Sequence, residues 1–470
     1  MDIYLSNTLT HKKDKFIPFK EGEVGIYSCG PTVYWNQHIG HMYAYTQWDI
    51  LVRFFRVLGY KVKWVMNITD VGHMTSDEDA GEDKMEKGAK REGLDVWQLA
   101  EKYIAQFKDS LNLLNISFPD VLCRATEHIE DQIKLIQKIE ANGFTYKTKV
   151  GVVFDTSKFP DYPKFANLDL KSQKAGARVE VDPEKKNPWD FLLWVTGQPN
   201  HIMQWDSPWG RGFPGWHIEC TAMSVKYLGE RFDIHTGGKE HIPVHHTNEI
   251  AQGYGAFGHQ TANYWLHNDW LSLKGGEKMS KSKGNFITVQ ELKEKGYNPL
   301  ALRYLFMTSH YKKGLEFSWE ALDAASVALS KLKQQTLSLR EEVSREVLSK
   351  EKLEKLESFR ERFLLSLADD LNIPSALAVV WEAAKSNIPS VDKYDLLLFF
   401  DEVLGLKMTE EMPKVEVPEE VLILARKRYS LRKEGLFDEA DKIRSEIESR
   451  GFGVKDLPDK TEVYPLNKNA

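Results

Sequence analysis

The sequence predicts an α/β protein with a doubly wound parallel sheet, and three consecutive segments carry that prediction. An apolar run over 24–28 has the composition of a strand and is followed by the turn Cys29-Gly30-Pro31. Segment 39–58 has the apolar spacing of an amphipathic helix that Gly59 can cap, and 61–67 is strand-like again. This unit has the length of a βαβ crossover. Its ligand is expected beyond the carboxyl ends of the strands, where Cys29 and His38 fall.

In the rest of the chain, predicted helices and a hairpin are followed by more α/β pattern and then by a long series of predicted helices. Helical spacing recurs at 97–114 and 124–141, and 146–156 alternates as a hairpin before a proline-rich stretch. A helix over 221–229, a strand over 232–235 and a helix over 244–253 then resume the α/β pattern. Further helices are predicted at 300–310, 319–337, 355–368, 372–384 and 394–404, then a linker at 407–418 and a helical hairpin at 419–434 and 438–450.

This order predicts a Rossmann-type catalytic domain that is interrupted by a connective insertion. A helical bundle and a small mixed C-terminal subdomain follow it. The expected boundaries are 1–114 and 204–284 for the two catalytic halves, 115–203 for the insertion, 285–320 for a linker, 321–410 for the bundle and 411–470 for the last subdomain.

Composition excludes several classes of protein. The 470 residues are 42% hydrophobic and 28% charged, as in ordinary globular domains, and no run of about 18 apolar residues predicts a membrane span. Three cysteines cannot form a disulfide framework, and the first residues lack a signal-peptide core, so we expect a reducing cytoplasm. The net charge of −6 does not exclude nucleic-acid binding, which needs only a local basic surface.

The first predicted helix begins with the motif His38-Ile39-Gly40-His41. A helix N-terminus presents unpaired N–H groups and a positive dipole end to phosphates. Gly40 leaves a gap where a flat ring can lie against the backbone. Two imidazoles add donors where negative charge develops in phosphoryl chemistry. Alone, the motif is short enough to occur by chance.

A second motif, Lys-Met-Ser-Lys-Ser at 278–282, follows a strand-like run over 270–273 and is flanked by glycines. Two lysines and two hydroxyls on such a loop suit a mobile clamp for a polyphosphate, although most lysine-rich loops are simply solvated. The order of strand, histidine motif, long interval and lysine motif is not expected by chance. In these features the chain resembles the class I aminoacyl-tRNA synthetases.

Cys29, Cys220, His245 and Glu249 form a candidate metal-binding set. His245 and Glu249 are four residues apart on a predicted helix and share a face, whereas His246 lies about 100° round the helix. Two thiolates, an imidazole and a carboxylate suit zinc, but two distant cysteines without a short CxxC motif are weak evidence. From the residues alone, small buried cysteines and a helix-capping histidine are the simpler interpretation. Cys123 has no such partners and is expected to be structural.

Longer motifs resemble those of cysteinyl-tRNA synthetase. They are Cys-Gly-Pro-Thr-Val-Tyr at 29–34 with the histidine motif, Gly-Trp-His-Ile-Glu-Cys at 215–220, and a His-His pair before Asn-Glu at 245–249. Shorter segments at 124–126, 175–178, 187–191 and 302–304 are also similar to the family. The resemblance implies that Cys29, Cys220, His245 and Glu249 hold one zinc ion. That ion would bind the substrate thiolate and so distinguish cysteine from serine.

The resemblance also implies roles for other residues. His38 and His41 would stabilise the transferring phosphates, and Lys278 and Lys281 would clamp ATP, which carries Mg²⁺. Gly40 would also contact ATP. Thr32, Trp216 and His235 would line the cysteine pocket, with core packing as the competing explanation for Trp216.

The expected partners are ATP, L-cysteine and tRNA(Cys), with no membrane and a monomeric chain. Residues 321–410 would bind the anticodon arm, 411–470 the anticodon itself, and 285–320 the stem. Arg426, Lys427, Arg428, Arg432 and Lys433 would form a basic face for this contact, and Tyr464 would stack on a base.

Three places depart from the family pattern: the acidic insertion at 72–82, the segment 239–244 and Thr247. They affect the surroundings of the zinc ligands and leave the ligands themselves in place. Three rivals remain: a cysteine ligase acting on an amino sugar, which would lack the segment beyond about residue 410, a silent tRNA-binding paralogue, and a small nucleotidyltransferase.

Overall fold

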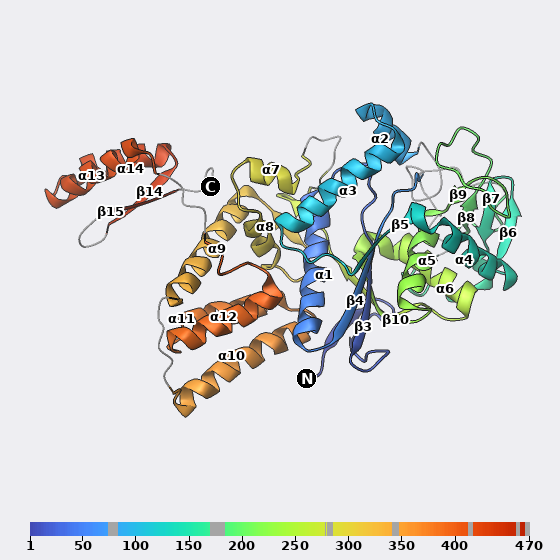
Figure 1. The fold of residues 1–470 in the computed structure, drawn as a ribbon, viewed down its shortest axis with the longest axis horizontal. Helices are drawn as coiled ribbons and strands as arrows, with labels where there is room; N and C mark the ends of the chain where they lie inside the picture. The colour runs from blue at the N-terminus through green and yellow to red at the C-terminus, as the bar shows by residue number, and fades with distance from the viewer. Residues whose placement is uncertain are drawn as a thin grey trace.

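A five-stranded parallel sheet with helices on both faces organises the catalytic part of the chain (Figure 1). The computed structural model describes residues 1–73, 83–169, 184–277, 279, 285–340, 347–411, 417–456 and 461–465. In spatial order the strands are β11 (Ala262–Asn268), β10 (Phe232–Gly238), β3 (Glu23–Ser28), β4 (Lys61–Ile68) and β5 (Val121–Arg124). Every pairing in this sheet is parallel, so the predicted doubly wound α/β fold is confirmed.

The two faces of the sheet belong to different cores, because successive side chains of a strand point to opposite sides. Ile26 and Trp64 pack in the same core as the apolar face of α1 (Ile39–Val57). Tyr27 and Val65, one residue further along each strand, belong to the core on the other face. The helices of that second face are α4 (Ile129–Ala141), α5 (Trp216–Leu228) and α6 (Thr247–Phe257).

The order of the strands places the site. From β3 the chain winds through α1 to β4 and β5 on one side, and the later strands β10 and β11 join on the other. The direction of winding therefore changes between β3 and β10, and a crevice opens at the carboxyl ends of strands at such a point. Cys29 directly follows β3, and Gly237 and Gly238 end β10.

A second sheet of four antiparallel strands lies at one end of the molecule (Figure 1). It contains β6 (Thr145–Thr148), β7 (Gly151–Phe154), β8 (Phe191–Val195) and β9 (Phe213–Pro214). The first two form the predicted hairpin. β5 lies within the segment 115–203 that we expected to be inserted, yet it is the edge strand of the central sheet. β9 lies beyond that segment and pairs with β8.

A group of helices shares a hydrophobic core with α1. Its members are α7 (Val289–Glu294), α8 (Pro299–Phe306), α9 (Trp319–Leu339), α10 (Lys350–Ala368), α11 (Ile373–Lys385) and α12 (Ser390–Leu404). The fully buried Arg303 of α8 joins them, because Nη2 donates to Asp49 of α1 at 2.6 Å and Nε donates to the carbonyl of Leu404 in α12 at 2.7 Å. The predicted helical region is confirmed.

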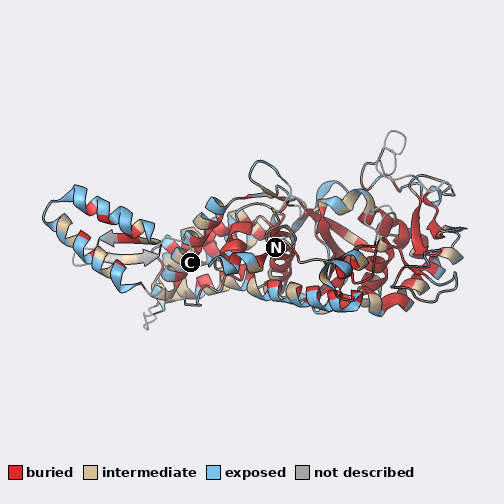
Figure 2. Cartoon of the chain, turned by 90° about the horizontal axis from the view of Figure 1, so that it is seen from above, coloured by how far each residue is buried: buried red, intermediate tan, exposed pale blue. Residues whose placement is uncertain are grey.

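The C-terminal unit lies at the opposite end of the molecule from the four-stranded sheet (Figure 2). It contains α13 (Glu419–Lys433), α14 (Phe437–Ser449), β14 (Phe452–Asp456) and β15 (Thr461–Pro465), around a core of its own. Arg428, which we expected on an exposed basic face, is only 2% exposed and pairs with Asp456 at 2.7 Å. The side chain of Tyr464 lies outside the described residues.

The remaining elements are short or peripheral. They are the hairpin β1 (Tyr4–Asn7) and β2 (Lys12–Lys15), the pair β12 (Leu271–Leu273) and β13 (Leu315–Phe317), and the helices α2 (Lys84–Glu92) and α3 (Val96–Leu113). Among the described residues, none of the helices has the length and apolar content needed to cross a membrane.

Candidate active site and metal centre

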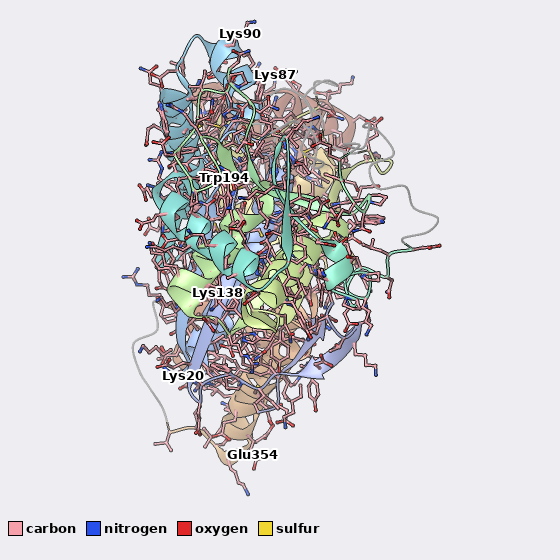
Figure 3. The ribbon with its side chains drawn as sticks, turned by 90° about the vertical axis from the view of Figure 1, so that its right-hand side faces the viewer. Lys20, Lys87, Lys90, Lys138, Trp194 and Glu354 are labelled. Carbon is pink, nitrogen blue, oxygen red and sulfur yellow. The ribbon has the colours of Figure 1, made fainter. Side chains whose placement is uncertain are left out.

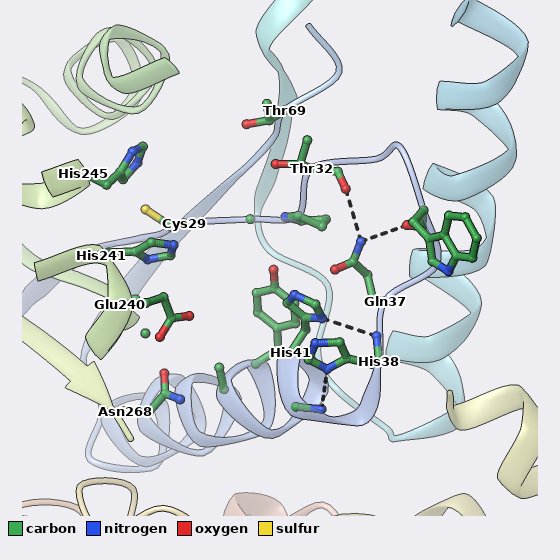
Figure 4. Close-up of a pocket in the computed structure, with 18 of the residues that line it drawn as sticks. Cys29, Thr32, Gln37, His38, His41, Thr69, Glu240, His241, His245 and Asn268 are labelled. Atoms are coloured by element: carbon green, nitrogen blue, oxygen red, sulfur yellow. Dashed lines mark hydrogen bonds between the residues drawn. The ribbon is translucent and has the colours of Figure 1, made fainter. Parts of the chain in front are cut away.

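A cavity of about 780 Å³ opens at the carboxyl ends of β3 and β10 (Figure 4). Cys29 and Gly30 line it from one strand end and Gly237 and Gly238 from the other. Gly30 is required there, since an added Cβ would lie 1.7 Å from the carbonyl oxygen of Asn67. The expected location of the site is therefore the location of the cavity.

His38 and His41 lie together on the cavity wall where α1 begins (Figure 4). The Gly40 N–H donates to Nδ1 of His38 at 3.0 Å, and the His38 N–H donates to Nδ1 of His41 at 3.3 Å. An imidazole that accepts through Nδ1 carries its proton on Nε2, so each ring keeps one N–H donor. The two rings thus cap the helix and present donors at its positive end.

Gly40 has a steric role in addition to the expected contact with ATP, which stays a prediction. A Cβ at this position would lie 2.8 Å from Cε1 of His38 and 3.3 Å from the methyl group of Met279. The absence of a side chain therefore lets the His38 ring fold back onto the helix start. Met279 also lines the cavity. Lys278 and Lys281 lie outside the described residues.

Five side chains that suit a metal ion converge at one side of this cavity, which three of them line. Cys29, His245, His246 and Glu249 place ligand atoms within 4.8 Å of one another, and the sulfur atoms of Cys29 and Cys220 are 4.0 Å apart. Nε2 of His245 is 3.2 Å from Oε1 of Glu249, and Sγ of Cys29 is 4.0 Å from the same oxygen. All five residues are buried. A tetrahedral zinc ion separates its ligand atoms by roughly 3.3–3.8 Å, so these residues fit zinc without large movement.

Burial determines what these side chains need in order to be charged. Burial raises the pKa of the Cys29 thiol and of the Glu249 carboxyl, and it lowers the pKa of His246. The hydrogen bond from Cys29 lowers the pKa of Cys220. Desolvation therefore favours neutral groups, and an anionic thiolate or carboxylate here needs a compensating positive charge. A divalent metal supplies that charge.

His246 also belongs to the cluster, because residues three apart at the start of a helix are neighbours just as residues four apart are. Residues Ile242–His246 form a π-helical turn before α6, with a winding that differs from the α-helix assumed above. Nε2 of His246 lies 3.2 Å from the sulfur of Cys29 and 3.9 Å from Glu249. Two imidazoles, those of His245 and His246, are therefore close enough to bind a metal ion, whereas helical spacing favours His245.

Each of these imidazoles is oriented through its second nitrogen. Nδ1 of His245 lies 2.9 Å from Nδ1 of His217, and Nδ1 of His246 lies 2.7 Å from Nε2 of His267. His267 in turn contacts the hydroxyl of Thr8 at 2.7 Å. Such contacts hold a ring with its other nitrogen toward a metal, so both histidines are preorganised.

The expected cysteine pocket is only partly as we described it. Thr32 and Trp216 line the cavity, and the Trp216 ring centroid is 4.9 Å from that of His245. His235 instead packs behind Cys29, stacked on Trp265 with a centroid distance of 4.3 Å. Its Nε2 is 3.5 Å from the sulfur of Cys29, so it supports the cluster from below.

Sequence reasoning missed a buried carboxyl beside the cluster. Glu219 is 0% exposed, accepts a hydrogen bond from the Thr69 hydroxyl at 2.8 Å and lies 2.6 Å from Nε2 of His73. Burial raises its pKa well above the ordinary value. The only local signal was its place before Cys220. Of the acidic insertion at 72–82, the structure describes Gly72 and His73, and residues 74–82 lie outside the described residues.

The chain resembles known proteins in sequence and in fold. Residues 15–327 match the family model for the class I (C) tRNA synthetase catalytic domain. In fold, the chain is similar to Mycobacterium tuberculosis methionyl-tRNA synthetase in complex with methionyl-adenylate, with a TM-score of 0.57 and 18% identity over 82% of this chain and 90% of that one. Fold, histidine motif and family model together define a class I tRNA synthetase.

Full-length relatives narrow the assignment. The chain is 44% identical to the cysteine–tRNA ligase of Treponema denticola over 98% of its own length and 99% of the relative's. It is also 44% identical to cysteine–tRNA ligase 1 of Burkholderia lata, over 100% of its own length and 98% of the relative's. The chain belongs to the cysteine–tRNA ligase family of class I tRNA synthetases.

Proposed function

We propose that the protein is a cysteine–tRNA ligase that activates cysteine with ATP and transfers it to the 3′ end of tRNA(Cys). The names of its relatives support this activity. The observation that carries the proposal is that one cavity is lined by His38 and His41 and also by Cys29, Cys220 and His245 of the candidate metal centre. A phosphate-binding end and a thiol-binding end thus meet in one site.

In the first step the carboxylate of cysteine attacks the α-phosphorus of ATP, and the bond to the pyrophosphate oxygen breaks. His38 and His41 stabilise the charge on the transferring phosphates through Nε2–H donors, helped by the positive end of α1. Lys278 and Lys281 hold the outer phosphates, with Mg²⁺ bound to ATP. No side chain needs to act as a nucleophile, because the substrate carboxylate has that role.

Cys29, Cys220, His245 and Glu249 would hold one zinc ion, with His246 as the alternative imidazole. When bound, zinc stabilises the thiolate form of a cysteine substrate and gives serine no equivalent bond. His217 keeps the ring of His245 in place, and His267 does the same for His246. Such selection exceeds what a size difference of one small group in a pocket provides, about 1–3 kcal/mol.

The cysteinyl group then moves to the terminal ribose of tRNA(Cys). We assign the anticodon arm to the helices α9 to α12 and the anticodon to the C-terminal unit, where Arg426, Arg432 and Lys433 remain on the surface side of α13. The relatives align through this unit. A ligase for an amino sugar was expected to lack it. We further propose that the protein is a monomer in the cytoplasm. Light scattering on the purified protein tests the monomeric state.

The test is cysteine-dependent ATP–pyrophosphate exchange by the wild type, Cys220→Ser and Cys123→Ser. Cys123 is an equally buried cysteine that donates to the carbonyl of Met66 at 3.5 Å, so it controls for the loss of a buried thiol. We expect exchange that needs cysteine, ignores serine and disappears with Cys220→Ser but not with Cys123→Ser. Charging of tRNA(Cys) must follow. Exchange without charging points to another acceptor, and zinc binding without exchange contradicts the enzymatic proposal.

A further inference from the structure

The cavity contains a cation for which the proposed chemistry has so far given no role. Among the cavity-lining residues that the structure describes, Lys84 and Glu240 are the only lysine, arginine or acidic side chains. Lys84 is the first residue of α2, and its Nζ lies 4.9 Å from the centroid of the Trp216 ring. The same ring is 4.9 Å from the ring of His245. An ammonium group and a candidate metal ligand therefore both adjoin the Trp216 indole.

The position of Lys84 is closely constrained. Its N–H donates to the carbonyl of His73 at 3.0 Å, and Asp83 before it caps α2 by accepting from the Glu86 N–H at 2.7 Å. The buried His201 holds the other oxygen of Asp83 at 2.8 Å. The start of α2 is thus tied to the chain on two sides, and the root of the Lys84 side chain has little freedom.

The other end of α2 is anchored to the loop that carries the histidine motif. The guanidinium of Arg91 lies 3.5 Å from the centroid of the Trp35 ring and donates to the carbonyl of Tyr34 at 3.3 Å. Gly88 permits this close approach, because a Cβ there would lie 3.0 Å from that carbonyl oxygen. α2 is therefore a fixed part of the cavity wall.

We propose that Lys84 binds the carboxylate of the amino-acid substrate. This inference rests on the proposed function. A cysteine with its sulfur at the metal centre would lie beside the Trp216 indole, because that ring adjoins His245 in the cavity wall. Only two carbon atoms separate the sulfur of cysteine from its carboxyl carbon. The ammonium of Lys84 adjoins the same indole, so it meets the carboxylate. Glu240 has the wrong charge for this role, and its carboxylate already accepts from Nε1 of Trp270 at 2.8 Å.

The contact has a chemical purpose. The carboxylate must approach an α-phosphate that is also negative, and a cation beside it reduces their repulsion. It also orients the attacking oxygen, while the sulfur is held at the other end of the molecule. Two-point binding of this kind distinguishes a free amino acid from a simple thiol.

The experiment compares cysteine with cysteamine, which is cysteine without its carboxylate. Dissociation constants for both are measured on the full-length, zinc-loaded protein by calorimetry for the wild type, Lys84→Met, Lys84→Gln and Lys84→Arg. The control is Lys90→Met, because Lys90 projects from the exposed side of the same helix (Figure 3). Zinc content and circular dichroism establish that each variant is folded.

We expect Lys84→Met and Lys84→Gln to bind cysteine about 10- to 100-fold more weakly, the loss of one charge-assisted hydrogen bond, with cysteamine unchanged. Lys84→Arg retains part of the affinity, and Lys90→Met matches the wild type. Equal weakening of cysteine and cysteamine overturns the inference, because Lys84 would then only support Trp216. Unchanged cysteine binding overturns it as well. A wild type that binds no cysteine instead refutes the proposed function on which the inference rests.

Discussion

Replacing Arg303 by Met should destabilise the junction between the α/β domain and the helices behind it. Arg303 is fully buried and donates four hydrogen bonds. One goes to Asp49 of α1, and the others go to main-chain carbonyls of Leu114, Asn115 and Leu404. Asp49 is also fully buried and accepts from the Ser117 N–H at 2.9 Å. Met keeps much of the side-chain volume and removes the charge and every donor.

The magnitude follows from what remains after the substitution. Breaking a buried ion pair by removing one partner costs about 3–5 kcal/mol, because the other charge stays buried. Arg53 still contacts Asp49 at 2.9 Å, and this contact lowers the cost in stability. Three main-chain carbonyls lose a hydrogen-bond donor, and their loss raises the cost. We therefore expect a cost of about 3–5 kcal/mol, which is a roughly 10²- to 10⁴-fold larger unfolded fraction.

Urea unfolding of the full chain, followed by tryptophan fluorescence and circular dichroism, measures this cost. The control is Arg362→Met, because Arg362 and Glu382 form a pair of the same 2.6 Å length with both side chains about half exposed. That substitution should cost no more than about 1 kcal/mol. Asp49→Asn together with Arg303→Met should be less harmful than Arg303→Met alone, since no buried carboxylate remains and Arg53, the other partner of Asp49, is partly exposed. Equal midpoints for Arg303→Met and Arg362→Met would refute the argument.

Other predictions concern the cavity. If His245 is the ligand and His246 the alternative, His245→Ala should weaken zinc binding at least about 100-fold and His246→Ala about tenfold, measured by competition with a chelator; the reverse order would make His246 the ligand. Burial raises the pKa of Cys29 and Glu249, so protons compete with the metal, and the apparent zinc affinity should fall about tenfold or more per unit as the pH is lowered from 8 to 6. A pH-independent affinity over that range contradicts this reasoning. Gly40→Ala should displace the His38 ring and lower kcat/KM for exchange at least about tenfold, with zinc content unchanged. The control is Gly59→Ala, which should affect only stability, because nothing lies within 4 Å of a Cβ added there. Wild-type exchange by Gly40→Ala would show that the close contact with His38 is relieved at no cost.

Sequence periodicity alone determined most of the secondary structure. The strand, helix and strand predicted at 24–28, 39–58 and 61–67 correspond to β3, α1 and β4, because residues two or about 3.6 apart must share a face. The histidine motif was placed at the start of α1 for the same local reason. The boundaries of the predicted helices differ from the observed ones where short elements meet. The predicted helix at 124–141 begins at the last residue of β5, continues as a turn of 3₁₀-helix (Ala125–His128) and becomes α-helical only in α4.

Long-range packing decided what the pattern left open. Cys29 and Cys220 are far apart in sequence, and only the parallel placement of β3 beside β10, with α5 packed on them, brings their sulfur atoms to 4.0 Å. His246 belongs to the cluster as well, because its Nε2 lies 3.2 Å from the sulfur of the distant Cys29, a contact that helical spacing alone does not reveal. Arg428 looked like surface charge but is buried against Asp456. The sequence by itself determined the local elements and the kinds of side chain at the sheet edge. The tertiary structure decided which of them meet, because contacts between distant segments depend on strand order and packing and not on local periodicity.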